Sequence, residues 1–243
     1  MITHVDIAPL AFDSHLFSLN VKSLEIPTDF PISGVIDAIQ ETDFDLLYIF
    51  SNLPIETELL QYEQLINLSY SDEKVVFSGS VENLISTNST MTVIANTFES
   101  ADVSLLESLA FQSGKFSRFY LDQKLPKKAF NTLYSTWLSK SLSKEYADDY
   151  YIAYDGKAVG LLTSSIRAGD AQIGLLAVDK HSRGKGIGRH LLSRFATEMK
   201  DRDIEKVIIP TQRANINACG FYQSLGLSES EHKFIYHCWK NNG

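Results

Sequence analysis

The sequence of 243 residues is poor in cysteine and has no long apolar run. Its two cysteines, Cys219 and Cys238, are too few for a disulfide scaffold, so we expect a cytoplasmic protein in a reducing compartment. No apolar stretch reaches the roughly 20 residues that a membrane-spanning helix needs, which argues against a membrane protein. The first residues lack the basic start, apolar centre and small-residue cleavage site of a secretory signal, so we expect none.

Basic residues are scarce in the first part of the chain and common in the rest. Residues 1–100 contain two basic and fifteen acidic residues, a net charge of −13, whereas residues 101–243 have a net charge of +5. The acidic first part argues against a nucleic-acid partner, because binding a phosphate backbone needs an extended basic face. The mildly basic second part would suit a small polyanionic ligand, although two differently solvated surfaces would explain the same asymmetry.

The apolar pattern predicts two α/β parts that meet near residue 88. Residues 86–90 are polar, lie close to the change in charge and are typical of a linker or long loop. The elements expected before this segment are strands at 46–50 and 74–77 and a helix at 57–68. A strand, a helix and a strand in this order indicate a small α/β unit. We therefore predict a smaller acidic N-terminal domain over residues 1–88 and a second domain over residues 89–243.

The second part alternates between helical and strand patterns. The expected helices are 102–112, 126–142, 186–200 and 215–225, and the expected strands are 150–154, 158–166, 171–178, 206–209 and 234–239. Asp102 is a candidate N-cap for the first of these helices. The dipeptide Asp155-Gly156 predicts a hairpin turn in which both residues have positive φ.

The glycine-rich segment 178–188 carries the most specific chemical signal. Its glycines lie between a predicted strand and a predicted helix, where the backbone can turn tightly and approach a ligand. Backbone N–H groups in such a turn, with the first turn of the helix, form a cradle for an anion. The spacing fits neither a dinucleotide fingerprint, which would need a glycine in place of Arg189, nor a Walker loop, which would need Ser or Thr in place of Gly186. A plain strand-to-helix turn is the alternative.

This segment resembles the pyrophosphate loop of the GCN5-related N-acetyltransferases, the GNAT family, which bind acetyl-CoA. The resemblance rests on two motifs, Arg183-x-x-Gly186-x-Gly188 and Asn215-x-x-Ala218-x-x-x-Tyr222. It spans roughly residues 93–239. It implies an α/β fold of the GNAT type, with a mixed, mostly antiparallel central sheet flanked by helices, here joined to the smaller N-terminal domain. It also implies acetyl-CoA as the acetyl donor and an amine as the acceptor.

The resemblance implies roles for individual residues. Tyr222 would be the general acid, main-chain groups of the last strand residues would hold the pantetheine arm, and the loop amides would bind the pyrophosphate. The implied cofactor-binding residues are Leu176, Ala177, Val178, Arg183, Gly184, Lys185, Gly186, Ile187, Gly188, Asn215 and Phe221. Asn215 and Tyr222 are two helical turns apart and can share a face, and a phenol can donate its proton to the departing sulfur. A core tyrosine and a simple N-cap are the alternatives for these two residues.

The general base is unassigned at this stage. Many members of the family carry a glutamate on the strand before the loop, but residues 171–178 contain no acid. Asp72, Glu73 and Asp122 are candidates, each with a solvated surface acid as the alternative, and an amine that arrives deprotonated would need no base. The six histidines show no metal-ligand spacing, so we expect no metal.

A second resemblance, to the TDP-fucosamine acetyltransferases, concerns the acceptor. It rests on the segments 12–17, 117–120, 173–177 and 211–212 and on Trp137. Those enzymes acetylate the 4-amino group of a TDP-4-amino-4,6-dideoxy sugar and have a smaller N-terminal α/β domain. The implied partner is a small-molecule amine, a nucleotide-linked amino sugar, with no nucleic acid and no membrane, and a homodimer stays open.

Four residues are the candidates for binding this acceptor, namely Arg118, Phe119, Tyr120 and Trp137. Arg118 could pair with a diphosphate, and Tyr120 or Trp137 could cover a sugar or a base. A purely structural role in the core is the alternative for Phe119 and Trp137. Two other function classes stay open, a protein or peptide N-acetyltransferase and a non-catalytic acyl-CoA-binding sensor.

Overall fold

The structure is a computed structural model that describes residues 5–27, 31–59, 62, 66–86, 91–99 and 102–240. Its strands are β1 (Ile7–Pro9), β2 (Val21–Glu25), β3 (Leu46–Ser51), β4 (Asn67–Ser80), β5 (Thr92–Ala95), β6 (Asp149–Tyr154), β7 (Ala158–Arg167), β8 (Asp170–Val178), β9 (Lys206–Gln212) and β10 (Ser228–Trp239). Its helices are α1 (Ala11–Phe17), α2 (Ile32–Glu41), α3 (Glu56–Leu59), the 3₁₀ helix η2 (Val81–Leu84), α4 (Val103–Ser113), α5 (Arg118–Leu121), α6 (Ala129–Leu142), α7 (Ile187–Lys200) and α8 (Ile216–Ser224).

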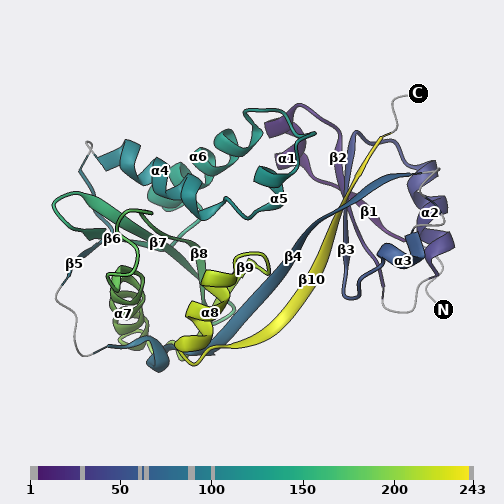
Figure 1. The fold of residues 1–243 in the computed structure, drawn as a ribbon. Coiled ribbons are helices and arrows are strands. Elements are labelled where there is room, and N and C mark those ends of the chain that lie inside the picture. Colours follow the sequence, from purple (N-terminus) through teal and green to yellow (C-terminus); the bar gives the residue numbers. More distant parts are fainter. Residues whose placement is uncertain are drawn as a thin grey trace.

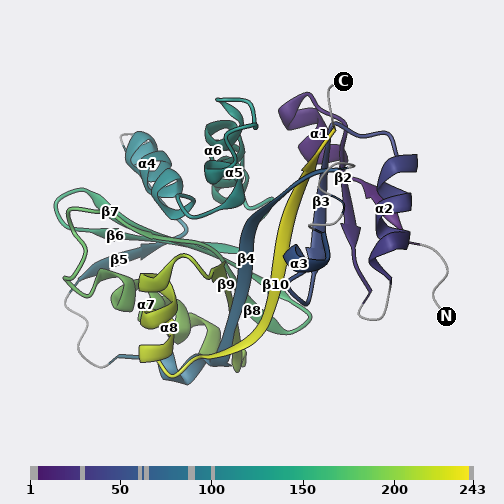
Figure 2. The ribbon, with the colours of Figure 1, turned by 45° about the vertical axis from the view of Figure 1, so that its right-hand side comes forward.

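The described strands form one ten-stranded sheet in the order β1-β2-β3-β10-β4-β9-β8-β7-β6-β5. The pairs β2·β3 and β8·β9 are parallel, and the other neighbouring pairs are antiparallel. Helices α4 and α6 lie on one side of the sheet, and α7 and α8 lie on the other (Figures 1 and 2). The expectation of a mixed, mostly antiparallel sheet flanked by helices is therefore confirmed.

Two long strands, β4 and β10, connect the two ends of this sheet. In Figure 1 they run from the part that holds β1–β3 to the part that holds β5–β9. β10 pairs with both β3 and β4, and β4 pairs in addition with β9. Residues 67–80 thus lie between two strands of the second part of the chain, and the sheet continues across the expected boundary at residue 88. The division into domains 1–88 and 89–243 stays a prediction.

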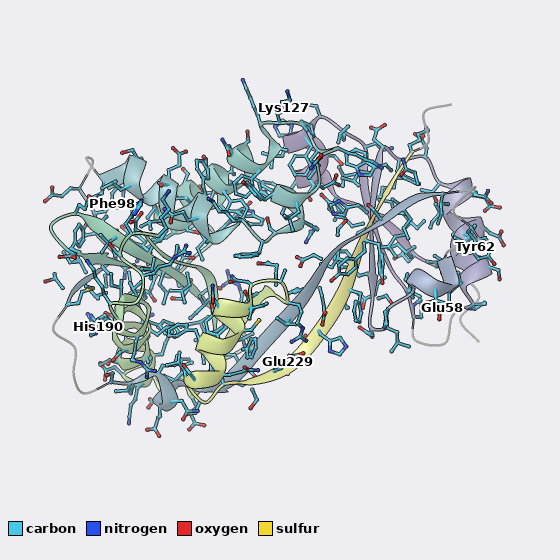
Figure 3. The ribbon with its side chains drawn as sticks, viewed as in Figure 1. Glu58, Tyr62, Phe98, Lys127, His190 and Glu229 are labelled. Carbon is cyan, nitrogen blue, oxygen red and sulfur yellow. The ribbon has the colours of Figure 1, made fainter. Side chains whose placement is uncertain are left out.

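The cores follow from the alternation of side chains along the strands. In β3, Leu46 and Tyr48 pack into a core with α4, α5 and α6, whereas Leu47 and Ile49 pack into a core with α2. This is the period of two that a strand imposes when both of its faces are covered. A third core lies between the sheet and helices α7 and α8. In Figure 3, His190 on α7 lies at one end of the molecule and Tyr62 lies at the other.

The elements expected in the second part of the chain are present, with shifts of at most three residues at their ends except in β10, which begins six residues earlier than expected. The short elements β5 and α5 were not predicted. Two local predictions were wrong. Asp102 does not cap α4, because its carboxylate instead accepts a hydrogen bond of 2.6 Å from the Tyr154 hydroxyl. In the β6–β7 turn only Gly156 has a positive φ, +72°, and Asp155 does not.

The first part of the chain was less well predicted. The strand at 46–50 is β3, and the strand at 74–77 is the middle of the longer β4. The helix expected at 57–68 is wrong at its end, where residues 67 and 68 begin β4, and part of it lies outside the described residues. Residues 87–90 of the expected linker also lie outside the described residues. Across the described parts of the chain, no helix has the length and apolar character needed to cross a membrane.

Candidate active site

The divergence of β8 from β9 is the central feature of the site. These parallel strands pair only at Ala171 with Val207 and at Gln172 with Ile208. Beyond Gln172, no strand among the described residues pairs with β8 on its β9 side. Apart from the Val178 carbonyl, which accepts a hydrogen bond from Arg183, the remaining length of β8 therefore offers backbone donors and acceptors at a free edge. An extended ligand can use this edge as a neighbouring strand would.

A β-bulge in β8 accompanies this divergence. Gly174 and Leu175 together lie opposite Thr163 of β7, whose hydroxyl accepts the Leu175 N–H at 2.9 Å. A bulge bends its strand and increases the local twist. Position 174 needs glycine, because a Cβ there would lie 2.9 Å from the Thr163 Oγ1 atom.

A cavity of about 310 Å³ lies beside the diverging strands, within the size range of small-molecule sites. One side is formed by 173–176 of β8, 209–212 of β9 and three residues at the start of and along α8. The opposite side is formed by residues at the end of α4, in α5 and in α6. Asp72 and Lys74 of β4 complete the lining together with Ile235 of β10. The cavity therefore combines residues from both parts of the chain.

Helix α8 presents Asn215 and Tyr222 to the cavity. The Asn215 side chain accepts the Ala218 N–H at 3.3 Å, so its role as an N-cap is confirmed. Tyr222 is 5% exposed, and its ring packs against Phe77 and Phe221 at centroid distances of 5.6 and 5.7 Å. Burial raises the pKa of the Tyr222 hydroxyl, so it keeps its proton at neutral pH. Tyr222 is thus a core residue that also lines the cavity.

The loop between β8 and α7 has several backbone N–H groups without an acceptor among the described residues. Gly184 and Gly186 have φ values of +81° and +78°, which place both in the left-handed region that favours glycine. The N–H groups of residues 184–188 find no hydrogen-bond acceptor among the described residues. Together with the positive end of the α7 dipole, they form an anion cradle.

Side chains of this loop make two contacts with neighbouring strands and turns. The Arg183 Nε donates to the Val178 carbonyl at 3.1 Å, and the Lys185 Nζ lies 3.4 Å from the Asp155 carboxylate. Phe221 supports the start of α7, since a Cβ at Gly188 would lie 3.3 Å from its ring. The loop residues proposed from the sequence therefore lie together, and the backbone N–H groups of residues 184–188 are free for a ligand.

On the opposite side of the cavity, Arg118 is held among aromatic rings. Its guanidinium carbon lies 4.2 Å from the ring centroid of Phe119 and 4.8 Å from that of Tyr48. The buried Arg118 Nε has no hydrogen-bond partner among the described residues. Phe119 and Trp137 also line the cavity. Tyr120 does not, because it is 50% exposed and packs against Phe130 at 5.0 Å.

Asp72 is the one carboxyl group among the described residues that line the cavity. Its side chain is buried, and burial raises its pKa to about 7 although nearby Arg118 acts in the opposite direction. The other two acids considered from the sequence are engaged elsewhere. Glu73 pairs with Arg213, and Asp122 accepts hydrogen bonds from two side chains of β10. The sequence signal for Asp72 was weak, because the predicted strand began only at residue 74.

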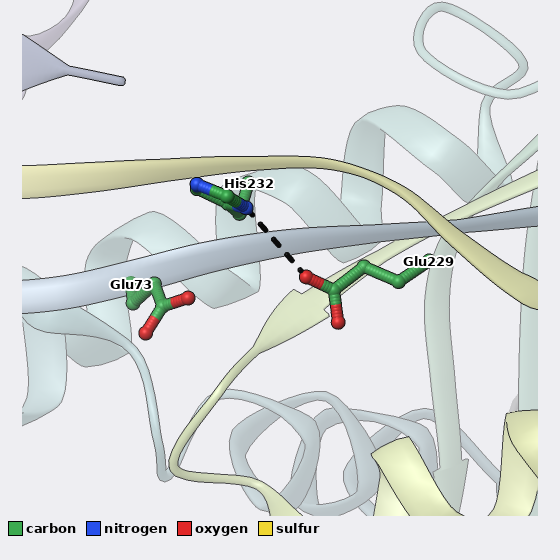
Figure 4. A group of neighbouring side chains, drawn as sticks. All are labelled: Glu73, Glu229 and His232. Carbon is green, nitrogen blue, oxygen red and sulfur yellow. Dashed lines mark ion pairs between the residues drawn. The ribbon is translucent and has the colours of Figure 1, made fainter. Parts of the chain in front are cut away.

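Glu73, Glu229 and His232 form a cluster of potential metal ligands in the described part of the chain (Figure 4). Their ligand atoms lie within 4.8 Å of one another. Arg213 already supplies a cation there, since its Nη2 lies 3.0 Å from the Glu73 carboxylate and 2.5 Å from that of Glu229. We therefore describe the cluster as an ion-pair network and assign it no metal.

The chain is similar in sequence to known acetyltransferases. Residues 107–227 match the acetyltransferase (GNAT) family model. An uncharacterised N-acetyltransferase of Methanocaldococcus jannaschii is 32% identical over 116 residues, which are 46% of this chain and 74% of that protein. The chain belongs to the GNAT family of acetyltransferases.

Two further similarities concern a longer stretch of the chain. The spore coat polysaccharide biosynthesis protein SpsD of Bacillus subtilis is 26% identical over 141 residues, 58% of this chain and 49% of SpsD. The chain thus spans about half the length of this relative. A Staphylococcus epidermidis protein of unknown function has a TM-score of 0.69 at 14% identity, over 96% of this chain and 90% of that chain. This similarity shows that the fold of the whole chain, with both parts in one arrangement, is also found in that protein.

Proposed function

We propose that this protein transfers the acetyl group of acetyl-CoA to the primary amine of a nucleoside-diphosphate-linked amino-deoxy sugar. The observation that carries this proposal is the cavity, whose lining combines the free edge of β8 and Tyr222 with one buried acid, one guanidinium and aromatic rings. The two buried free cysteines suit a reducing compartment such as the cytoplasm.

The donor would lie along β8 and the glycine loop. In this arrangement the main chain of Leu176, Ala177 and Val178 holds the pantetheine arm, because this part of β8 has no partner strand on its β9 side. The pyrophosphate then lies against the free N–H groups of residues 184–188. A backbone N–H near Leu176 can stabilise the oxyanion of the tetrahedral intermediate, an effect of about 3 kcal/mol in comparable sites.

Tyr222 would protonate the departing sulfur. Its raised pKa keeps the hydroxyl in the protonated form that a general acid needs. An ordinary thiol has a pKa of about 8.5, below that of this phenol, so the hydroxyl serves first as a hydrogen-bond donor while negative charge develops on the sulfur. Its position on α8, beside the same cavity as Leu176, supports this role.

The acceptor would occupy the side of the cavity that α5 and α6 form. Arg118 can bind a diphosphate through two parallel hydrogen bonds, and the rings of Phe119 and Trp137 offer apolar surface to a sugar. The relative SpsD is named for polysaccharide biosynthesis, which agrees with a sugar substrate. Within this class, we propose a TDP-4-amino-4,6-dideoxy sugar.

The test is an acceptor screen in which the release of free CoA thiol is measured. The panel holds TDP-linked amino sugars, the same sugars without the nucleotide, and basic peptides. We expect the nucleotide-linked sugars to have the highest kcat/KM. Replacement of Arg118 by Gln should raise KM for the nucleotide sugar at least tenfold and leave the free amino sugar much less affected, because a charged hydrogen bond contributes about 1.5–3 kcal/mol.

Other results of the screen would contradict the proposal. Faster acetylation of basic peptides than of every nucleotide sugar would favour a protein or peptide N-acetyltransferase. Tight binding of acetyl-CoA with no turnover of any amine would instead favour an acyl-CoA-binding sensor.

A further inference from the structure

We propose that Asp72 is the general base of this reaction and that the first part of the chain therefore supplies a catalytic group to the acetyltransferase site. The inference rests on the proposed amine acetylation. The cavity-lining residues of β8, Ile173–Leu176, include no acid that could serve as the base. The inference therefore places the base on β4.

The position of β4 brings Asp72 to the cavity. β4 pairs with β9 on one side and with β10 on the other, and Asp72 lies opposite Ile235 in the β10 pairing. Both of these residues line the cavity. Asp72 is 6% exposed, its carboxylate accepts a hydrogen bond from the backbone N–H of Glu73, and Arg118 is a nearby positive charge. No side chain among the described residues forms an ion pair or a side-chain hydrogen bond with Asp72, so its carboxyl group can accept a proton from a ligand in the cavity.

The surrounding charges suit a base that works near neutral pH. Burial raises the pKa of Asp72 to about 7, Arg118 on α5 lowers it, and Glu73 on the same strand raises it. The other titratable groups at the cavity are Lys74 on β4, Tyr134 on α6 and Tyr222 on α8. A base with a pKa near the working pH combines a useful ionised fraction with a useful proton affinity.

The proton balance of the reaction has a place for this base. A bound ammonium group carries three protons, and the amide product keeps one. Asp72 takes one proton, which frees the nitrogen lone pair to form the C–N bond with the thioester carbon. As the C–S bond breaks, the sulfur receives the other proton from Tyr222, which recovers it from the tetrahedral nitrogen. Asp72 then releases its proton to solvent, and the products are the amide, CoA thiol and one proton.

The experiment compares Asp72→Asn with the full-length wild-type protein across a pH range from about 5 to 9. We expect kcat to fall by about 10²–10⁴-fold, whereas acetyl-CoA affinity measured by calorimetry stays near the wild-type value. In the wild type, kcat/KM should rise with pH through about 7, since the base must be ionised. In Asp72→Asn this rise should move to the pKa of the acceptor amine itself, because only the free amine can then react.

Two further variants test the assignment independently. Arg118→Gln removes the charge that lowers the pKa of Asp72, so the rise in kcat/KM should shift to higher pH. Glu73→Gln is the matched control, because Glu73 is the next residue of β4 but pairs with Arg213 and does not line the cavity. The Glu73→Gln variant should keep the wild-type kcat. Its rise in kcat/KM should shift slightly to lower pH, because Glu73 raises the pKa of Asp72.

Wild-type turnover and an unchanged pH profile in Asp72→Asn would overturn the inference and leave the proposed function intact. A wild-type protein that acetylates no amine would overturn the proposed function, and the assignment of Asp72 with it. If Asp72→Asn does not fold, Asp72→Glu decides the question. A shift of its kcat/KM profile supports the role of a base, and an unchanged profile at wild-type kcat rejects it.

Discussion

Replacement of Gly186 by Val tests whether the loop before α7 is the binding site for acetyl-CoA. Gly186 precedes the first residue of α7 and has a φ of +78°. A Cβ at this position would lie 3.7 Å from the His190 Nε2 atom, which is an ordinary contact, so no clash is expected within the protein. We expect the valine methyl groups instead to take up space that a pyrophosphate bound to the free N–H groups of 184–188 would need.

The expected magnitude has two separate parts. A residue other than glycine in the left-handed region costs about 1–2 kcal/mol of folding stability. A hydrogen bond to a charged group contributes about 1.5–3 kcal/mol. Loss of one or two of the bonds from the loop to a pyrophosphate would weaken binding by about 3 kcal/mol, which corresponds to about a 10²-fold fall in affinity.

Gly169→Val is the matched control for backbone strain. Gly169 has a φ of +87°, and a Cβ there would meet no atom within 4 Å. It lies in the turn between β7 and β8, at the opposite end of β8 from the glycine loop. Calorimetric titration with CoA should show a large loss of affinity for Gly186→Val and none for Gly169→Val, while both lose similar stability. Unchanged affinity in Gly186→Val would refute the assignment of the loop.

Two further predictions concern single side chains. Tyr222→Phe should lower kcat by about 10²–10⁴-fold with little change in CoA affinity, because the lost hydroxyl acts mainly in the transition state. Steady-state kinetics measures kcat, and a CoA titration measures the affinity. Near-normal turnover would remove Tyr222 from the mechanism. Asp122→Ala should lower the free energy of unfolding by about 3 kcal/mol near neutral pH, since it removes the acceptor of bonds from His237 Nδ1 (2.6 Å) and Trp239 Nε1 (3.0 Å). Burial alone would raise the pKa of Asp122, but these bonds hold it below its usual range. The stabilising effect of Asp122 is therefore present above the ordinary carboxyl pKa and lost as the pH falls below about 4. The free energies of unfolding of wild type and variant, measured by denaturant titration, should converge in acid. A difference between them that is independent of pH would contradict this prediction.

The sequence was most informative where structure is determined locally. The apolar stripe that predicts α6 is buried at Phe130, Leu133, Tyr134 and Leu138. The glycine loop was predicted with its neighbouring strand and helix, because a positive φ at Gly186 and a helix start are both properties of a short segment. Apolar periodicity and turn residues reflect contacts between residues within about ten positions of each other, so they predict local elements such as α6 and the glycine loop.

Contacts between distant segments could not be predicted in this way. The pairing of Lys74 with Gln212 joins residues from the two parts of the chain, and no local pattern in β4 encodes its partner. Asp72 was one of three candidate bases in the sequence, and two contacts with distant segments distinguish it from Glu73: Asp72 lines the cavity, whereas Glu73 pairs with Arg213. The divergence of β8 from β9 and the bulge at Gly174 and Leu175 are both defined by pairing with other strands, β9 and β7, which no local pattern in β8 encodes.

The pairing of β4 has a consequence for how the site is built. β9 has β8 as a partner for only two residues, so over most of its length β4 is the strand that fixes its position. β9 in turn contributes residues 209–212 to the cavity wall, next to Asp72 and Lys74 of β4 itself. Without residues 67–80, both β9 and β10 would expose a strand edge, and the cavity would lose its acid. Residues 89–243 contain the loop, Tyr222 and most of the cavity lining, but the cavity is complete only when Asp72 and Lys74 of the first part of the chain are paired into the same sheet.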